Sequence, residues 1–164
     1  MEPIAFTVTH KNILRALITP CGVSRAYDPS SGQPMPPIRQ FNAVWDTGAT
    51  NSVISASVAQ ALGLTPFTFV QVYHAQGCSN VNAYMVNIVL PNNVVMQSVK
   101  VSEGVIEGYD VLIGMDIIGV GDFAVTHKNG GTVFSFQVPS THEYDFVKQI
   151  QHQKENAPLK RKHK

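Results

Sequence analysis

Apolar residues that recur at every second position predict that most of this chain forms β-strands. The alternation is clearest between Tyr84 and Leu90, where four large apolar side chains fall on one face of the expected strand. Residues 98–102 alternate in the same way and form the expected returning strand after a turn at residues 91–93. Further strands are expected at residues 4–8, 13–18, 41–45, 52–55, 67–73, 111–113, 123–125 and 132–138.

One segment departs from this pattern and predicts a helix at residues 55–62. Val58 and Leu62 are four positions apart, as on one helix face, and Gly63 is placed as the C-terminal stop. A second helical turn is expected to begin at Met115, directly after a short apolar run. The pattern as a whole therefore predicts an all-β fold with one or two short helices.

The composition fits a compact domain with many turns. The chain has 164 residues and a mass of 17.9 kDa, which is the size of a single domain. Hydrophobic residues make up 44% and charged residues 14%, and the 12 glycines and 10 prolines favour a turn-rich β protein over a disordered one. We expect one domain at residues 1–139 and a polar, basic, flexible tail at residues 140–164.

Positive charge is concentrated at the C-terminal end. The formal net charge is +1, and the four basic residues among the last five leave the rest of the chain at −3. A body of this charge is not a nucleic-acid surface, so no nucleic-acid partner is expected. We interpret the basic end as a solvated tail; a contact with nucleic acid or a membrane is the alternative, and the tail's function is left unassigned.

Neither a membrane partner nor a metal or other cofactor is expected. No stretch approaches the roughly 20 apolar residues of a membrane span, and residues 1–12 lack the pattern of a signal peptide, so a cytoplasmic location is expected. Cys21 and Cys78 fit no CxxC pattern, and the histidines show no HExxH spacing. Reduced thiols are therefore expected, with an exposed, oxidisable Cys78 as the alternative to an inert one.

The tripeptide Asp46-Thr47-Gly48 is the first candidate for chemistry. It follows an apolar strand, and a glycine in a tight turn lets a bound molecule approach the backbone closely. In unrelated proteins such an Asp often only caps a turn by accepting backbone N–H groups. The surrounding sequence must therefore decide between a catalytic and a turn-capping carboxylate.

A second motif lies about 65 residues further along the chain. The segment from Ala43 to Thr50, with Asp46-Thr47-Gly48-Ala49 at its centre, is followed by Asp110-Val111-Leu112-Ile113-Gly114. This pairing resembles the retropepsin family of aspartic peptidases over roughly residues 41–118. The resemblance implies a closed β-barrel that forms a two-fold homodimer and hydrolyses peptide bonds.

The resemblance also implies roles for individual residues of the first motif. Asp46 corresponds to the catalytic aspartate, and Thr47 to the hydroxyl that locks the two active-site loops across the dimer axis. Gly48 corresponds to the residue that bonds the substrate backbone. Ala49 corresponds to a residue lining the pockets nearest the cleaved bond, and Thr50 to a further substrate-binding position.

Substrate contacts are also implied further along the chain. Leu112 corresponds to a second residue of the pockets nearest the cleaved bond, and residues 76–80 to the tip of the flap, so that Gln76, Gly77 and Cys78 would contact substrate. Retroviral members usually place an acid where this chain has Thr50 and an Arg where it has Met115. Both partners of that ion pair are absent together, so a neutral, packed arrangement is expected there.

One such motif per chain implies that the active site is shared. Two copies of Asp46 would activate a water without metal or cofactor, and the expected partners are a second copy of the chain and an extended peptide. The alternative is a retropepsin-like dimerisation or binding domain with weak or no catalysis. A β-barrel with a chance Asp-Thr-Gly is a third interpretation.

Overall fold

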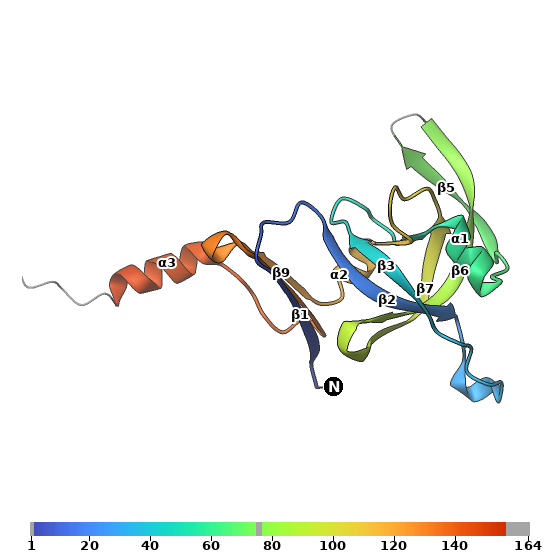
Figure 1. Ribbon diagram of the computed structural model, residues 1–164. Helices are drawn as coiled ribbons and strands as arrows, with labels where there is room; N and C mark the ends of the chain where they lie inside the picture. Colours follow the sequence, from blue (N-terminus) through green and yellow to red (C-terminus); the bar gives the residue numbers. More distant parts are fainter. Residues whose placement is uncertain (1, 75–76, 157–164) are drawn as a thin grey trace, which may run out of the picture.

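The computed structural model describes residues 2–74 and 77–156 and consists of two β-sheets with short helices (Figure 1). The helices are α1 (Ala56–Leu62), α2 (Met115–Ile118) and α3 (Phe146–Glu155). The strands are β1 (Ile4–His10), β2 (Leu17–Arg25), β3 (Arg39–Trp45), β4 (Val53–Ile54), β5 (Thr68–His74), β6 (Gly77–Leu90), β7 (Val94–Glu103), β8 (Val111–Ile113), β9 (Asp122–Thr126) and β10 (Thr132–Val138).

Six strands close into a barrel. The larger sheet has the order β2-β3-β8-β4-β7-β6-β5, and β2 also pairs with β6, which joins the two ends of the six-strand ring. Strand β5 lies outside the ring and extends the edge at β6. The predicted mostly β fold with a closed barrel and few short helices is confirmed, and the two-fold dimer stays a prediction.

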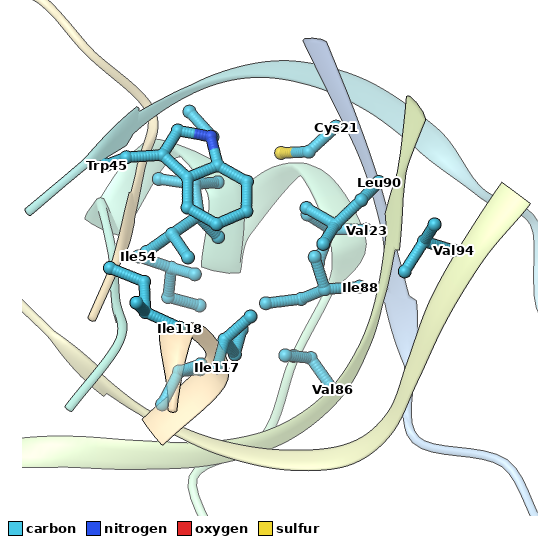
Figure 2. Close-up of a cluster of buried hydrophobic side chains, with 14 of the residues drawn as sticks. Cys21, Val23, Trp45, Ile54, Val86, Ile88, Leu90, Val94, Ile117 and Ile118 are labelled. Carbon is cyan, nitrogen blue, oxygen red and sulfur yellow. The ribbon is translucent and has the colours of Figure 1, made fainter. Parts of the chain in front are cut away.

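The barrel is filled by side chains that point inward from alternate positions of its strands (Figure 2). Strand β6 provides the clearest case, because Tyr84, Val86, Ile88 and Leu90 are all buried, as their spacing predicts. Helix α2 closes part of the interior with Ile117, which is also buried. This core holds β3 and β8 side by side, and the candidate site lies at the end of these two parallel strands.

An aromatic cluster joins the second sheet to the barrel. The smaller sheet has the order β1-β10-β9, and its side chains Phe6, Phe123, Phe134 and Phe136 surround Trp45 with ring centroids 5.0 to 5.9 Å from the indole. The indole Nε1 donates a hydrogen bond to the hydroxyl of Thr19, so the one polar atom of this large buried ring is satisfied. The residue before Asp46 is therefore held by both sheets.

The first predicted helix is confirmed, with Ser55 capping its N-terminus and Gly63 ending it in the left-handed conformation (φ 56°). The predicted strand at residues 13–18 is wrong in its first half. Pairing with β3 begins only at Leu17, opposite Trp45, and Ile13 is 61% exposed in the preceding loop.

Helix α3 lies within the segment expected as a tail and extends away from the barrel (Figure 1). In the part of the chain described, no helix is long and apolar enough to cross a membrane.

Candidate active site

Asp46 lies where strand β3 ends and a tight turn begins. Its backbone N–H donates a hydrogen bond to the carbonyl oxygen of Ile113 (2.9 Å), and its Oδ1 accepts one from the N–H of Gly48 (2.8 Å). Asp46 is half-buried, whereas Thr47 and Gly48 are exposed. The turn thus presents an oriented carboxylate at the surface of the barrel. A turn-capping Asp would make the same bond to Gly48, so the distinction rests on the surroundings.

The turn is fastened from behind by the start of helix α2. The N–H groups of Met115 and Asp116 donate to the carbonyl oxygens of Ala49 (2.8 Å) and Thr50 (3.1 Å). Gly114 makes this approach possible, because a Cβ atom there would lie 2.7 Å from a backbone atom of the facing loop. The two motifs that the sequence analysis paired are therefore in direct contact.

A buried hydroxyl and a carboxylate complete this fastening. Ser52 is fully buried and donates its N–H (2.9 Å) and its hydroxyl (2.7 Å) to the carboxylate of Asp116, while its Oγ accepts the N–H of Gly114 (3.0 Å). Thr50 and Met115, where the resemblance led us to expect a neutral, packed arrangement, are both exposed. The Ser52–Asp116 pair was not predicted from the sequence, although an Asp in the first turn of an expected helix is a typical feature of helix starts.

Asp110, the other acid near the second motif, also has a place in the barrel. Its Oδ2 accepts the backbone N–H of Asn42 (3.0 Å), and its own N–H donates to the carbonyl of Asn42 (3.1 Å). Burial raises the pKa of the nearby Cys21 thiol to about 12, and the charge of Asp110 adds to the effect. Cys21 is therefore a protonated core side chain at neutral pH.

Strands β5 and β6 form a hairpin that extends beyond the barrel (Figure 1). Residues 77–80, expected as part of a flap tip, are paired with residues 71–74 and begin one arm of this hairpin, and their role as a flap stays a prediction. Gly77 and Cys78 lie near its end and are exposed, and the amide of Gln71 donates to the Cys78 sulfur (3.4 Å). Gln76 lies outside the described residues.

A cavity of about 630 Å³ lies between this hairpin and the barrel. Val72 and Val81 line it from the hairpin, Ile106 from the loop after β7, and Leu112 from strand β8. Its volume falls within the range of small-ligand pockets, about 300–1,000 Å³. Of the site residues expected from the sequence, the structure places Leu112 in this wall, while Asp46, Thr47, Gly48, Ala49 and Thr50 form the turn at the strand ends.

No arrangement that could hold a metal ion is found among His, Cys, Asp and Glu side chains of residues 2–74 and 77–156.

Comparison with known protein families shows which family the chain belongs to. Residues 38–119, half of the 164-residue chain, match the family described as "gag-polyprotein putative aspartyl protease". The chain belongs to this family. The match includes both Asp46 and Gly114, and thus the whole turn and its fastening. A comparison with curated proteins gave no match.

One solved structure shares the fold of this aspartyl protease family member, and two others are similar over part of it. A retropepsin-like aspartic protease from Rickettsia conorii is 11% identical and aligns over 84% of this chain and 97% of its own, with a TM-score of 0.51. The simian foamy virus (mac) protease is 12% identical over 63% of this chain and 92% of its own (TM-score 0.42). The retroviral protease-like domain of Ddi1 from Leishmania major is 17% identical over 74% and 95% (TM-score 0.45).

Proposed function

We propose that this chain is an aspartic endopeptidase in which Asp46 is the catalytic carboxylate. The observation that carries the proposal is the turn at the end of β3, which holds this carboxylate at the surface while α2 fastens it from behind. Membership in an aspartyl protease family supports a hydrolase acting on peptide bonds. Asp110 and Asp116, the acids of the second motif, each tie two segments of the barrel together, whereas the side chain of Asp46 bonds only within its own turn among the contacts described, which supports Asp46 as the acid placed for chemistry.

The complete site requires a second copy of the chain. The sequence contains one Asp-Thr-Gly, whereas hydrolysis in this class uses two carboxylates that share a proton. The exposure of Thr47 and Gly48 supports a contact between two such turns about a two-fold axis. In that dimer, the Thr47 hydroxyl bonds across the axis and Gly48 bonds the substrate backbone.

Two like charges a few ångströms apart cannot both ionise, so one Asp46 of the pair retains a proton. The ionised Asp46 takes a proton from a water as its oxygen attacks the peptide carbonyl. The protonated Asp46 stabilises the developing oxyanion and assists departure of the amine. Hydrolysis is therefore expected to be fastest on the acid side of neutrality, where the shared proton is retained.

The substrate is an extended peptide that lies between the turn and the β5–β6 hairpin. Ala49, Thr50 and Leu112 form the floor of this site, and Gly77 and Cys78 form its cover. An extended segment satisfies its backbone groups by pairing with a strand edge, and the hairpin presents such an edge. Closure of the hairpin excludes water from the reaction.

The test is digestion of a diverse peptide mixture by the full-length protein, followed by mass spectrometry. Wild type is expected to produce cleavage products, and Asp46→Asn none, because the shared-proton pair is lost. Asp28→Asn, in the distant loop between β2 and β3, is the matched control and should cleave like wild type. Equal cleavage by wild type and Asp46→Asn would remove the assignment. Peptide binding without any Asp46-dependent cleavage would instead identify a non-catalytic binding domain.

A further inference from the structure

One charged side chain lines the otherwise mainly apolar cavity beneath the hairpin. Glu103 ends strand β7 and is half-buried in the cavity wall, close to Val81 and Leu112. Among the residues known to line this cavity in the described part of the chain, it is the only charged one. A carboxylate on an apolar wall is costly unless a partner compensates it.

Neighbouring side chains hold the Glu103 carboxylate in place. Its Oε2 accepts a short hydrogen bond from the hydroxyl of Tyr84 (2.6 Å) and a longer one from the Asn82 side-chain amide (3.3 Å). Tyr84 is buried in the barrel core, and its pKa is raised by burial and by this bond to Glu103. The tyrosine thus keeps its proton and acts as a fixed donor to one carboxylate oxygen.

These bonds orient the carboxylate without neutralising its charge. Both donors are neutral and both reach Oε2, so Oε1 is left to face other partners. The ion pairs found within residues 2–74 and 77–156 all lie between residues 122 and 148, far from Glu103 in the chain. The carboxylate therefore faces the cavity with no cationic side chain of the described residues paired to it.

A lysine or arginine side chain of a peptide has the required form. Its charged head can donate to Glu103 Oε1, and its aliphatic stem can pack against Val72, Val81 and Ile106 on the apolar wall. A neutral side chain of similar length would make the apolar contacts and leave the carboxylate uncompensated. We propose that this cavity is a specificity pocket for a basic side chain of the peptide, with Glu103 as the residue that recognises it. The proposal rests on the proposed function for the position of the peptide.

The test measures binding to the Asp46→Asn protein, so that hydrolysis does not enter. The probes are two series of fluorescently labelled valine-rich hexapeptides. In one series a single Lys occupies each position in turn, and in the other norleucine replaces that Lys. Hydrogen bonds to charged groups correspond to roughly a tenfold change in affinity or more. We expect at least about a tenfold tighter binding of the Lys peptide at one or more positions, measured by fluorescence anisotropy at low salt.

Variants of Glu103 and Glu107 distinguish recognition of the Lys side chain by Glu103 from general attraction of a cationic peptide to acidic residues. Glu103→Gln keeps the shape of the side chain and can still accept from Tyr84, and it should equalise the two affinities by weakening only the Lys peptide. Glu103→Lys should reverse the preference toward a peptide with Glu at that position. Glu107→Gln changes an exposed acid four residues away that is not among the cavity residues, and it should keep the preference.

The outcomes for the pocket and for the enzyme are distinct. Equal affinities for the Lys and norleucine peptides at every position, or no binding of either, would overturn the pocket. A preference for the Lys peptide that survives in Glu103→Gln would also overturn it, whatever Glu107→Gln shows. Peptide cleavage is measured separately, by comparing wild type with Asp46→Asn. If the Lys and norleucine peptides bind equally but only wild type cleaves peptides, the pocket is overturned and the proposed peptidase stands.

Discussion

At the scale of single residues, Asp116 fastens the turn that carries Asp46 from behind. Asp116 accepts hydrogen bonds from both the N–H and the hydroxyl of Ser52, and a third from the N–H of Ile117 (3.0 Å). These bonds tie the loop that follows Asp46 to helix α2 over 64 residues of sequence. A carboxylate accepts at both oxygens, which an amide cannot do.

We therefore expect Asp116→Asn to loosen the active-site turn and reduce cleavage without abolishing it. The amide NH₂ group would face one of the Ser52 donors, and an unsatisfied buried donor costs about 1–3 kcal/mol of unfolding free energy. Chemical denaturation and kcat on one peptide substrate provide the measurement. Met115→Leu, at an exposed neighbouring position of α2, is the control and should leave both unchanged. Complete loss of cleavage with unaltered stability would instead identify Asp116 as a catalytic acid.

At the scale of elements, the local pattern predicted most strands but not all the contacts between them. The burial of alternate residues in β6 follows directly from their apolar spacing. The Ser52–Asp116 pair could not be predicted in this way, because it depends on β4 pairing beside β8 in one register. The wrong strand start at Ile13 has a similar cause, since an apolar residue in a loop looks the same as one in an edge strand.

The C-terminal segment contains helix α3, which the apolar pattern of the sequence did not predict. Few large apolar residues mark residues 140–156, yet Asp145 accepts the N–H groups of Val147 and Lys148 (3.0 Å each) and caps helix α3. Phe146, Val147 and Ile150 of this helix are all more than half exposed. The polar composition predicted a flexible tail at residues 140–164; Asp145 caps a helix within this segment, and the flexibility of the tail stays a prediction.

Asp122 of strand β9 attaches the start of this segment to the smaller sheet. Its carboxylate accepts from the Ser140 hydroxyl and from the N–H groups of Thr141 (2.9 Å) and His142 (3.0 Å). These bonds, led by the one from Ser140, hold the pKa of Asp122 well below its usual range. A lowered pKa in the folded state means that the fold stabilises the ionised carboxylate relative to the unfolded chain.

The attachment is therefore expected to be complete above the ordinary Asp pKa of about 3.9 and to weaken as pH falls from there through the lower, folded value. Hydrogen exchange of the Thr141 and His142 amides, corrected for intrinsic rates at each pH, provides the measurement. Asp122→Asn should remove much of their protection at neutral pH. Asp28→Asn, whose carboxylate caps a distant turn, should not. Equal protection in wild type and Asp122→Asn at neutral pH would contradict the role given to Asp122.

At the scale of the whole molecule, the proposed function gives each chain one half of an aspartic peptidase site. Asp46 stands at an exposed turn, and the acids nearest to the second motif are held by the barrel. An enzyme built from two such halves responds to an inert subunit differently from an enzyme with one complete site per chain. This difference gives a test of the shared site that needs no structure of the dimer.

We expect Asp46→Asn subunits to inactivate wild-type subunits and not merely to dilute them. When equal amounts of the two proteins exchange subunits at a concentration well above the dimer dissociation constant, random pairing leaves about one quarter of the dimers fully wild type. The mixed dimers are inactive because they lack the two carboxylates that share a proton. Peptidase activity should therefore fall, relative to wild type at the same total concentration, to about one quarter as exchange proceeds.

Mixing wild type with Asp28→Asn is the matched control, because that variant keeps Asp46 and should leave the activity of the mixture unchanged throughout. Independent sites on separate chains would give about half the activity of wild type from the first moment, with no dependence on exchange time. Such a result would exclude the shared site and require a second acid within each chain. Asp110 and Asp116 would then be the first to substitute, although their bonds to Asn42 and Ser52 make them structural residues in the fold as it stands.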